Sequence, residues 1–392
     1  MHVLAGESAL RALRAVRFRE LTVPVAQLAL QSQEVRLPGQ EEATVPSSDQ
    51  VLLRNLRTLA GEGFPFQNVE ANMRLELWQL GDVGPFTPER PLELAVFDRV
   101  HRTRGKKYRT RELPRTLPAD ALVRVNPNLY FVSPELIVSQ MAPSLSAIQL
   151  AKLIMELCGR YSLSPAEDQR NKTKYQLEPV TSLDRIKRYS GLTKVRGGAK
   201  TLREALNYAL EGSASPSETV LALMMSLPQE LGGYGFAKPT LNASLTVPDE
   251  HIGRVSGLKY SLDAFWQDAY TDLEYESAEF HLDPLAAAAL VAARDGKFDS
   301  DSSAERRRRE YITKADADRR RLRDLQVLGI HVIPVTSFDL SSIRRFDQVA
   351  YALAKNINGH DTNGLENWIT DLDESSYRKR RLHLLQSLND DS

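Results

Sequence analysis

The chain has 392 residues, which is more than one compact core usually holds and predicts two or three domains. Its apolar content of 42% and charged content of 26% are ordinary for a water-soluble globular protein, and no apolar run is long enough to span a bilayer. The formal net charge is +0, the N-terminus lacks the apolar core of a signal peptide, and the single cysteine excludes an internal disulfide or a multi-cysteine zinc site. We therefore expect a cytoplasmic protein without a membrane segment.

The first half of the chain begins with residues 1–88, which combine helix-like stretches with a Pro-, Glu- and Ser-rich stretch. This composition predicts a helical or irregular segment. Further along, residues 166–212 are strongly basic and are interpreted as a linker.

Between these two segments, residues 89–165 have the pattern of an α+β domain. Ser133, Pro134 and Glu135 form a helix start, because serine caps the first turn, proline fits its first position and an acid favours its N-terminal end. The strand-like runs that precede this start lie at 92–97, 121–125 and 129–132.

Basic clusters in three places are candidates for contact with a nucleic-acid backbone. Such contact by Lys and Arg is independent of sequence and sensitive to salt. Solvated surface loops and linkers have the same composition, so that alternative stays open. The candidate nucleic-acid-binding residues are Arg102, Arg104, Lys106, Lys107, Arg109, Lys172, Lys174, Arg306 and Arg307.

The second half of the chain, residues 213–357, alternates helices and strands and predicts an α/β domain, followed by a loosely held tail at 358–392. The expected order is a helix from 215, a strand at 243–247, a hairpin with arms at 259–266 and 273–277, a long helix at 304–328 ended by Gly329, a strand at 330–336 and a helix at 341–357.

The hairpin brings acidic residues together. If it closes symmetrically, Asp263 lies across from Glu274, and Glu276 shares the face of Glu274 because side chains two apart point the same way. Like charges at this distance repel unless a cation lies between them, and a divalent metal with oxygen ligands is the usual solution. Asp263 and Glu274 are therefore candidate metal ligands, with Glu276 as a third ligand or a base. Solvated acids on an outer strand face are the alternative.

His281 follows the hairpin and is a candidate general base near neutral pH. A single histidine in a loop is also compatible with a structural role.

The order of elements and several short motifs resemble the restriction-endonuclease-like fold, in particular the small endonuclease-like family related to very-short-patch-repair nucleases. The matching pieces are SPSE at 215–218, LDAFW at 262–266, LEYES at 273–277, DADRR at 316–320 and IHVIPVT at 330–336. The resemblance implies a mixed sheet flanked by helices, Mg²⁺ or Mn²⁺ as cofactor, and Glu218 as an additional metal ligand.

Two features depart from that family. Glu276 stands where the family has a lysine, and extra residues occur at 284–303. Lys314, Arg319 or Arg320, on the helix that follows, is expected to supply the missing positive charge.

Residues 121–161 resemble, more weakly, the C-terminal domain of AbiEi-type abortive-infection antitoxins, through the strand pair, the SPE helix start and ELCGRY at 156–161. This resemblance implies a toxin or another defence-system protein as partner.

Together these features predict an α/β protein that is a Mg²⁺-dependent DNA endonuclease, tied to phage defence or DNA repair. Two alternatives remain: a catalytically inactive DNA-binding regulator, and an antitoxin-like protein that neutralises a toxin.

Overall fold

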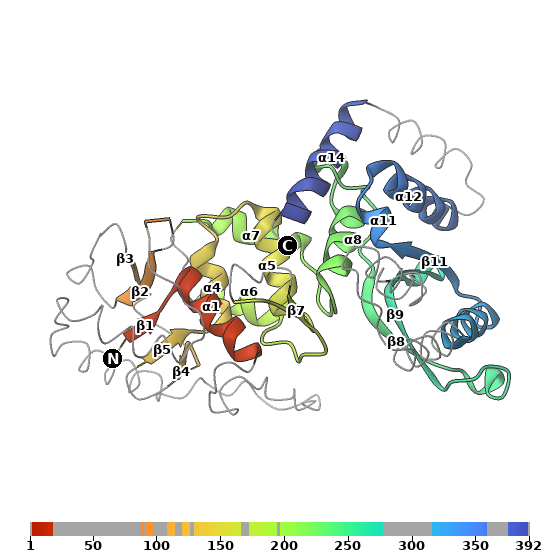
Figure 1. Cartoon of the computed structure of the whole chain (residues 1–392), viewed down its shortest axis with the longest axis horizontal. Coiled ribbons are helices and arrows are strands. Elements are labelled where there is room, and N and C mark those ends of the chain that lie inside the picture. Colours follow the sequence, from red (N-terminus) through yellow and green to blue (C-terminus); the bar gives the residue numbers. More distant parts are fainter. Residues whose placement is uncertain are drawn as a thin grey trace, which may run out of the picture. The chain divides into compact units, whose positions relative to one another are not determined.

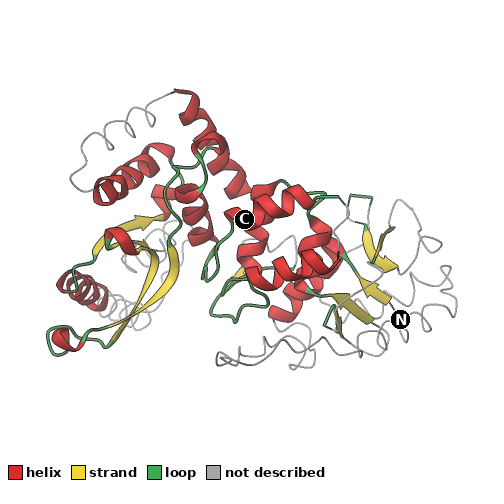
Figure 2. Cartoon of the chain, turned by 180° about the vertical axis from the view of Figure 1, so that it is seen from behind, coloured by secondary structure: helices red, strands yellow, loops and turns green. Residues whose placement is uncertain are grey.

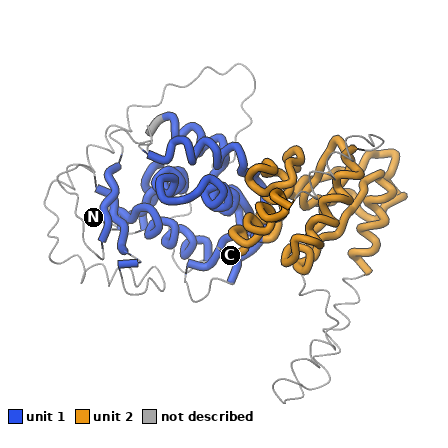
Figure 3. Tube along the Cα trace, turned by 90° about the horizontal axis from the view of Figure 1, so that it is seen from above, with its two compact units in different colours: residues 1–216, 392 blue, residues 217–391 orange. Residues whose placement is uncertain are grey.

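The computed structural model describes residues 2–18, 88–89, 91–96, 108–113, 120–125, 129–165, 172–193, 197–276, 316–358 and 375–390. It is a mixed α/β protein, which confirms the expected class, and helices and strands occur in both of its compact units (Figure 2). The units comprise residues 1–216 and 217–391 (Figure 3). Within the described part of the chain, every helix is too short or too polar to pass through a lipid bilayer.

The first unit is built on a five-stranded mixed sheet in the order β3-β2-β1-β5-β4 (Figure 1). β1 runs parallel to β5 and antiparallel to β2, while β2 and β3 are parallel. The strands are β1 (His2–Leu4), β2 (Leu92–Val96), β3 (Tyr108–Glu112), β4 (Leu122–Arg124) and β5 (Leu129–Val132).

The helices of this unit are α1 (Gly6–Arg17), α4 (Pro134–Met141), α5 (Ala147–Leu157), α6 (Leu183–Thr193) and α7 (Ala199–Tyr208), and a short strand pair joins β6 (Ser162–Leu163) to β7 (Thr173–Lys174). The helix start at Ser133 is confirmed, because its hydroxyl accepts a hydrogen bond from the Leu136 N–H. The adjacent Glu135 is fully buried and accepts hydrogen bonds from Thr181 Oγ1 at 2.6 Å and Arg185 Nε at 2.9 Å. These bonds join α4 to α6.

The described elements group differently from the segments expected from the sequence. β1 and α1, within the 1–88 segment, belong to the sheet of the first unit, and the 166–212 stretch contains helices α6 and α7 that pack on α4 and α5. The arginines of α1 gave no sign of this in the sequence: Arg14 is half-buried by its ion pair with Glu156, and Arg17 is buried and donates to the Glu156 carbonyl oxygen. The basic stretch after β2 also contains a strand, β3, instead of being loop throughout.

The second unit has a four-stranded sheet in the order β11-β10-β9-β8, in which β8, β9 and β10 form an antiparallel meander and β11 runs parallel to β10. The strands are β8 (Thr240–Thr246), β9 (Lys259–Trp266), β10 (Thr271–Glu276) and β11 (His331–Thr336). The short helical turns are η5 (Gln229–Leu231), η6 (Asp249–His251) and η7 (Gln267–Ala269), and the helices are α8 (Pro216–Ser226), residues 316–327, α11 (Ser337–Leu340), α12 (Ile343–Asn358) and α14 (Ser375–Asp390).

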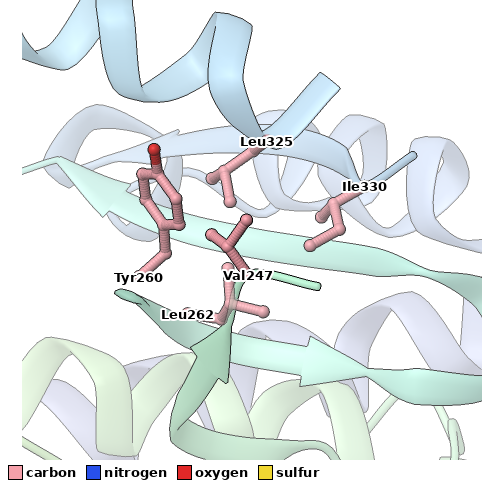
Figure 4. Packing of buried hydrophobic residues seen from close by; sticks show 5 residues of the cluster. All are labelled: Val247, Tyr260, Leu262, Leu325 and Ile330. Carbon is pink, nitrogen blue, oxygen red and sulfur yellow. The ribbon is translucent and has the colours of Figure 1, made fainter. Parts of the chain in front are cut away.

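A hydrophobic cluster holds the helix at 316–327 in this unit. Leu325 and Ile330 pack with residues from the meander, as Figure 4 shows; those residues are Val247, Tyr260 and Leu262. Gly329 has φ +76°, which confirms that a glycine in the left-handed region ends the helix.

The stretch at 358–392, expected to be a loose tail, contains the ordered helix α14. The Arg381 guanidinium lies 5.4 Å from the centre of the Tyr234 ring and pairs with Asp347 at 3.2 Å. Tyr234 also donates a hydrogen bond to Asp347 at 2.8 Å, so α14 is fastened to α12 through this group.

Candidate functional site

The β9–β10 hairpin forms as the alternating pattern predicts. Leu273 pairs with Ala264 at the last position of the ladder, so Glu274 and Asp263 are the next residues on the two strands. The turn contains η7 and Tyr270, whose φ is +45°. β10 begins at Thr271, earlier than the sequence pattern indicated, and this brings Asp272 onto the strand.

Two carboxylates of the hairpin bond to backbone groups of the opposite strand. Asp263 Oδ2 accepts a hydrogen bond of 2.9 Å from the Tyr275 N–H, and Asp272 Oδ1 accepts one of 3.0 Å from the Ala264 N–H. The side chains thus take the place of carbonyl oxygens where the ladder ends. Both carboxylates are thereby held in fixed positions beside Glu274.

Arg321 supplies positive charge to this group from the helix at 316–327. Its Nη1 pairs with Glu274 Oε1, and its Nη2 donates to the carbonyl oxygen of Ser261. Burial alone would lower the pKa of the Arg321 guanidinium, but the hydrogen bond and ion pair with Glu274 raise it above its ordinary value. The guanidinium is therefore a permanent cation at the edge of the cluster.

The negative charge of the cluster exceeds what one arginine balances. Burial raises the pKa of the Asp263 carboxyl to about 7, and the neighbouring charges of Glu274 and Glu218 add to the increase. Burial likewise raises the pKa of Asp272 to about 8, helped by Glu274 and Asp263. Near neutral pH the isolated cluster therefore retains protons that ordinary aspartates have lost.

Glu218 reaches the same cluster from α8. It is 7% exposed, and its Oε2 accepts a hydrogen bond of 2.7 Å from Asn242 Nδ2 on β8. The negative charge of Glu218 adds to the increase in the pKa of Asp263 that burial and Glu274 cause. We define the acidic cluster as Asp263, Asp272, Glu274 and Glu218, with Arg321 as its cation.

Two oxygens of the acidic cluster are buried without a donor. Within the described residues, no hydrogen-bond donor reaches Asp272 Oδ2 or Glu274 Oε2. Because both atoms are acceptors and the two side chains touch, a proton or a cation between them would satisfy both. In the present arrangement the described residues offer no group of three or more His, Cys, Asp or Glu side chains placed to hold a metal ion.

The other predicted site residues lie on several elements of the chain or outside its described part. Glu276 ends β10, half-buried and paired in register with Thr336 of β11. Arg319, one of the residues predicted to supply positive charge, is exposed and pairs with Asp316 at 3.6 Å, whereas Arg321 makes the contact with Glu274. The predicted residues outside the described part of the chain are His281, Lys314, Arg102, Arg104, Lys106, Lys107, Arg306 and Arg307.

Three predicted nucleic-acid-binding residues lie in the first unit. Arg109 on β3 and Lys172 are exposed. Lys174 instead donates a hydrogen bond of 2.8 Å to the carbonyl oxygen of Phe18 and lies 5.8 Å from the centre of that ring, which gives it a packing role in this structure.

Asp272 and Arg321 were missed at the sequence level, although each had a signal. Asp272 precedes Glu274 by two residues and so shares its face of a strand. Arg321 precedes Leu325 by four residues, which places both on the inward face of the helix, whereas Arg319 is turned by about 200° from Arg321.

No protein-family model matches the chain, and neither a curated protein nor a solved structure matches it. The acidic cluster and the elements that build it are therefore the basis for assigning a function.

Proposed function

We propose that the second unit is a metal-dependent endonuclease that hydrolyses phosphodiester bonds in DNA. The observation that carries this proposal is the gathering of four carboxylates around one arginine, with Asp272 and Glu218 buried and Asp263 and Glu274 half-buried. Like charges gathered in this way lower stability, so an excess of them in a folded protein is typical of a site that binds a cation or transfers protons.

The topology of the second unit supports the proposal. Helix α8 is followed by the meander β8–β9–β10, then by the helix at 316–327 and by β11 parallel to β10. This is the order of helices and strands on which the resemblance to restriction-endonuclease-like proteins rests. The acids lie on the two strands where that resemblance would place them.

The donor set suits Mg²⁺ or Mn²⁺. Magnesium prefers hard oxygen ligands and needs only one or two protein carboxylates, and the buried oxygen of Glu274 lacks a donor. Asp263 and Glu274 would hold the ion with water at its other positions, because Glu218 on α8 is not placed with them as a three-carboxylate metal site. The bound ion would neutralise charge on the phosphate and activate water for attack.

The surrounding side chains have separate roles in this proposal. Arg321 has five N–H donors, of which the described contacts engage two, and the remaining donors would bind a phosphate oxygen. It would thus supply the positive charge that the family's lysine provides and that Glu276 lacks. Asp272 holds Asp263 and Glu274 in place from the ladder, and Glu276 would accept a proton through water.

Cleavage of supercoiled plasmid with Mg²⁺ or Mn²⁺ tests the proposal. Asp263→Asn and Glu274→Gln should each lower the nicking rate at least about 100-fold, because losing a ligand removes several kcal/mol of transition-state stabilisation. Asp268→Asn is the matched control, since Asp268 is exposed in the turn of the same hairpin. Its activity should equal that of the wild type.

Equal activity in all four proteins would contradict the assignment of the site. Absence of cleavage with every divalent ion, together with salt-sensitive DNA binding, would replace the nuclease by a DNA-binding regulator that has lost catalysis.

A further inference from the structure

The helix at 316–327 has arginines on two opposite faces. Arg321 points inward to the acidic cluster, on the same side as the buried Leu325. Arg319, Arg320 and Arg323 are all exposed. One helix therefore contributes one arginine to the cluster and three to its own solvent-exposed side.

The rotation of this helix about its axis is fixed, so the outward arginines have a defined direction. Asp324 accepts hydrogen bonds from the Ser256 N–H at 3.1 Å and from the Tyr260 hydroxyl at 2.8 Å. Leu325 is fully buried in the cluster of Figure 4, and Arg321 is paired with Glu274. Contacts on one side therefore hold the other side toward solvent.

Charge on the outward face is net positive. Arg319 pairs with Asp316 at 3.6 Å, but the two side chains are 76% and 59% exposed, so the pair is screened and weak. The Arg320 Nε donates to the Asp316 carbonyl oxygen at 3.4 Å, at the long end of the hydrogen-bond range. Asp316 and Asp318 are the exposed acids of this helix, against three exposed arginines.

A phosphodiester substrate needs such a surface. The acidic cluster repels a polyanion, and its single arginine is already paired with Glu274. Positive charge on the outward side of the same helix would offset that repulsion and raise the local concentration of an anionic strand. Arg319 and Arg323 are about 6 Å apart along the helix axis, close enough for both to contact one nucleic-acid backbone.

We infer that Arg319, Arg320 and Arg323 form a phosphate-binding surface that holds the backbone of DNA on the outward side of the helix that carries Arg321. The inference rests on the proposed function, because an endonuclease site in the same unit is the reason for this helix to bind a polyanion. Arginine binds phosphate oxygens through paired N–H donors and carries no sequence information by this contact. The surface therefore supplies affinity without sequence preference.

The salt dependence of DNA binding tests the inference, measured with the Asp263→Asn variant as the background protein. This variant lacks a proposed metal ligand, so binding is measured without cleavage. The affinity of a labelled duplex is followed against KCl concentration in EDTA for the background protein and for Arg320→Ala plus Arg323→Ala. Each lost phosphate contact should reduce the slope of log affinity against log salt by about 0.9, so the double variant should lose about 1.8. Alanine is favourable in a helix, and circular dichroism will confirm that the fold is retained.

Arg378→Ala plus Lys379→Ala is the matched control, since both residues are exposed on α14 of the same unit. It should leave the slope unchanged. An equal loss of slope in both double variants, no change in either, or no DNA binding by the background protein would overturn the inference.

The two proposals can fail separately. Plasmid cleavage that depends on Asp263, combined with binding that ignores Arg320 and Arg323, would remove this surface and keep the nuclease. Binding that depends on those arginines without cleavage would keep the surface and remove the nuclease.

Discussion

Each unit buries a network of charged side chains, and the two networks are balanced in opposite ways. In the first unit, Glu156 faces two arginines: Arg14 contacts both of its oxygens, at 3.0 and 2.7 Å, and Arg17 donates to its backbone carbonyl at 3.0 Å. Burial alone would raise the pKa of Glu156, but Arg14 and Arg17 bring it below its ordinary value. Its charge is therefore fully compensated.

The acidic cluster of the second unit has the reverse ratio, with four carboxylates to one arginine. Its aspartates have raised pKa values, and two of its buried oxygens lack donors within the described residues. A balanced network is explained by folding alone, whereas the excess of negative charge is not. Charge balance, rather than burial, therefore distinguishes a structural ion network from a candidate functional site.

The largest effect is expected where balance is broken in the first unit. Glu156→Ala removes the carboxylate bonded to Arg14 and the negative charge beside buried Arg17, and should lower the free energy of unfolding by about 3–5 kcal/mol. Urea unfolding followed by circular dichroism measures the change, and Glu156→Gln should lose less because it keeps hydrogen bonding. A loss below about 1 kcal/mol for the alanine variant would remove the structural interpretation.

The second unit should respond to pH in the direction opposite to that of a salt-bridged protein. An unfolded aspartate titrates near pH 4, whereas the folded-state pKa values of Asp263 and Asp272 are about 7 and about 8. Between these values the folded state binds more protons, so stability in EDTA should fall as the pH rises from 5 to 8 and then level off. We expect a loss on the order of 3 kcal/mol, measured by urea unfolding at pH 5.5, 7 and 8.5.

Asp272→Asn isolates the origin of this pH dependence. The asparagine oxygen can accept the same hydrogen bond from the Ala264 N–H but cannot ionise. The variant should therefore be more stable than the wild type at pH 8.5 and show a shallower fall with pH, while exposed Asp268→Asn should behave as the wild type. Identical pH profiles for the wild type and Asp272→Asn would mean that Asp272 is not the titrating group.

Binding of a metal ion should offset the excess negative charge of the acidic cluster. At a Mg²⁺ or Mn²⁺ concentration ten times the dissociation constant, binding to the folded state alone contributes about 1.4 kcal/mol. Thermal unfolding at pH 8 should shift upward for the wild type and remain unchanged for Asp263→Asn plus Glu274→Gln. An equal shift in both would indicate a metal site elsewhere in the chain.

The sequence predicts the hairpin well because alternation and a short polar break are local signals. The same alternation brings Asp263 and Glu274 together without any tertiary information. Glu218 was associated with the site only through a family resemblance, and its burial depends on Asn242, on a neighbouring strand. The start of β10 at Thr271 is supported by pairing with Trp266 of β9 and with His331 of β11, and the second of these partners is not visible in any local pattern.

The sequence does not show which charged residues are buried by partners that are distant along the chain. No local pattern indicates that an arginine of α1 is buried, yet Arg17 is 6% exposed because its donors meet backbone carbonyls at the end of α5. In the run of arginines at 319–321, only the helical period distinguishes the inward residue. The prediction of Lys314, Arg319 or Arg320 does not take the spacing from Leu325 into account, and Arg321 is the arginine that contacts Glu274.

The smallest effect on stability is expected at Arg319, and it sharpens the contrast between the two kinds of charge. Arg319→Ala removes an exposed pair with Asp316 and should change the free energy of unfolding by less than about 0.5 kcal/mol. The same variant should nevertheless lower the salt slope of DNA binding by about 0.9, because a phosphate contact is lost. Asp316→Ala is the complementary variant: it leaves the arginine in place, so the slope should be retained and affinity should increase. A change of stability without a change of binding in Arg319→Ala would give this arginine a structural role, comparable to that of Arg14 in the first unit. It would then not belong to the phosphate-binding surface.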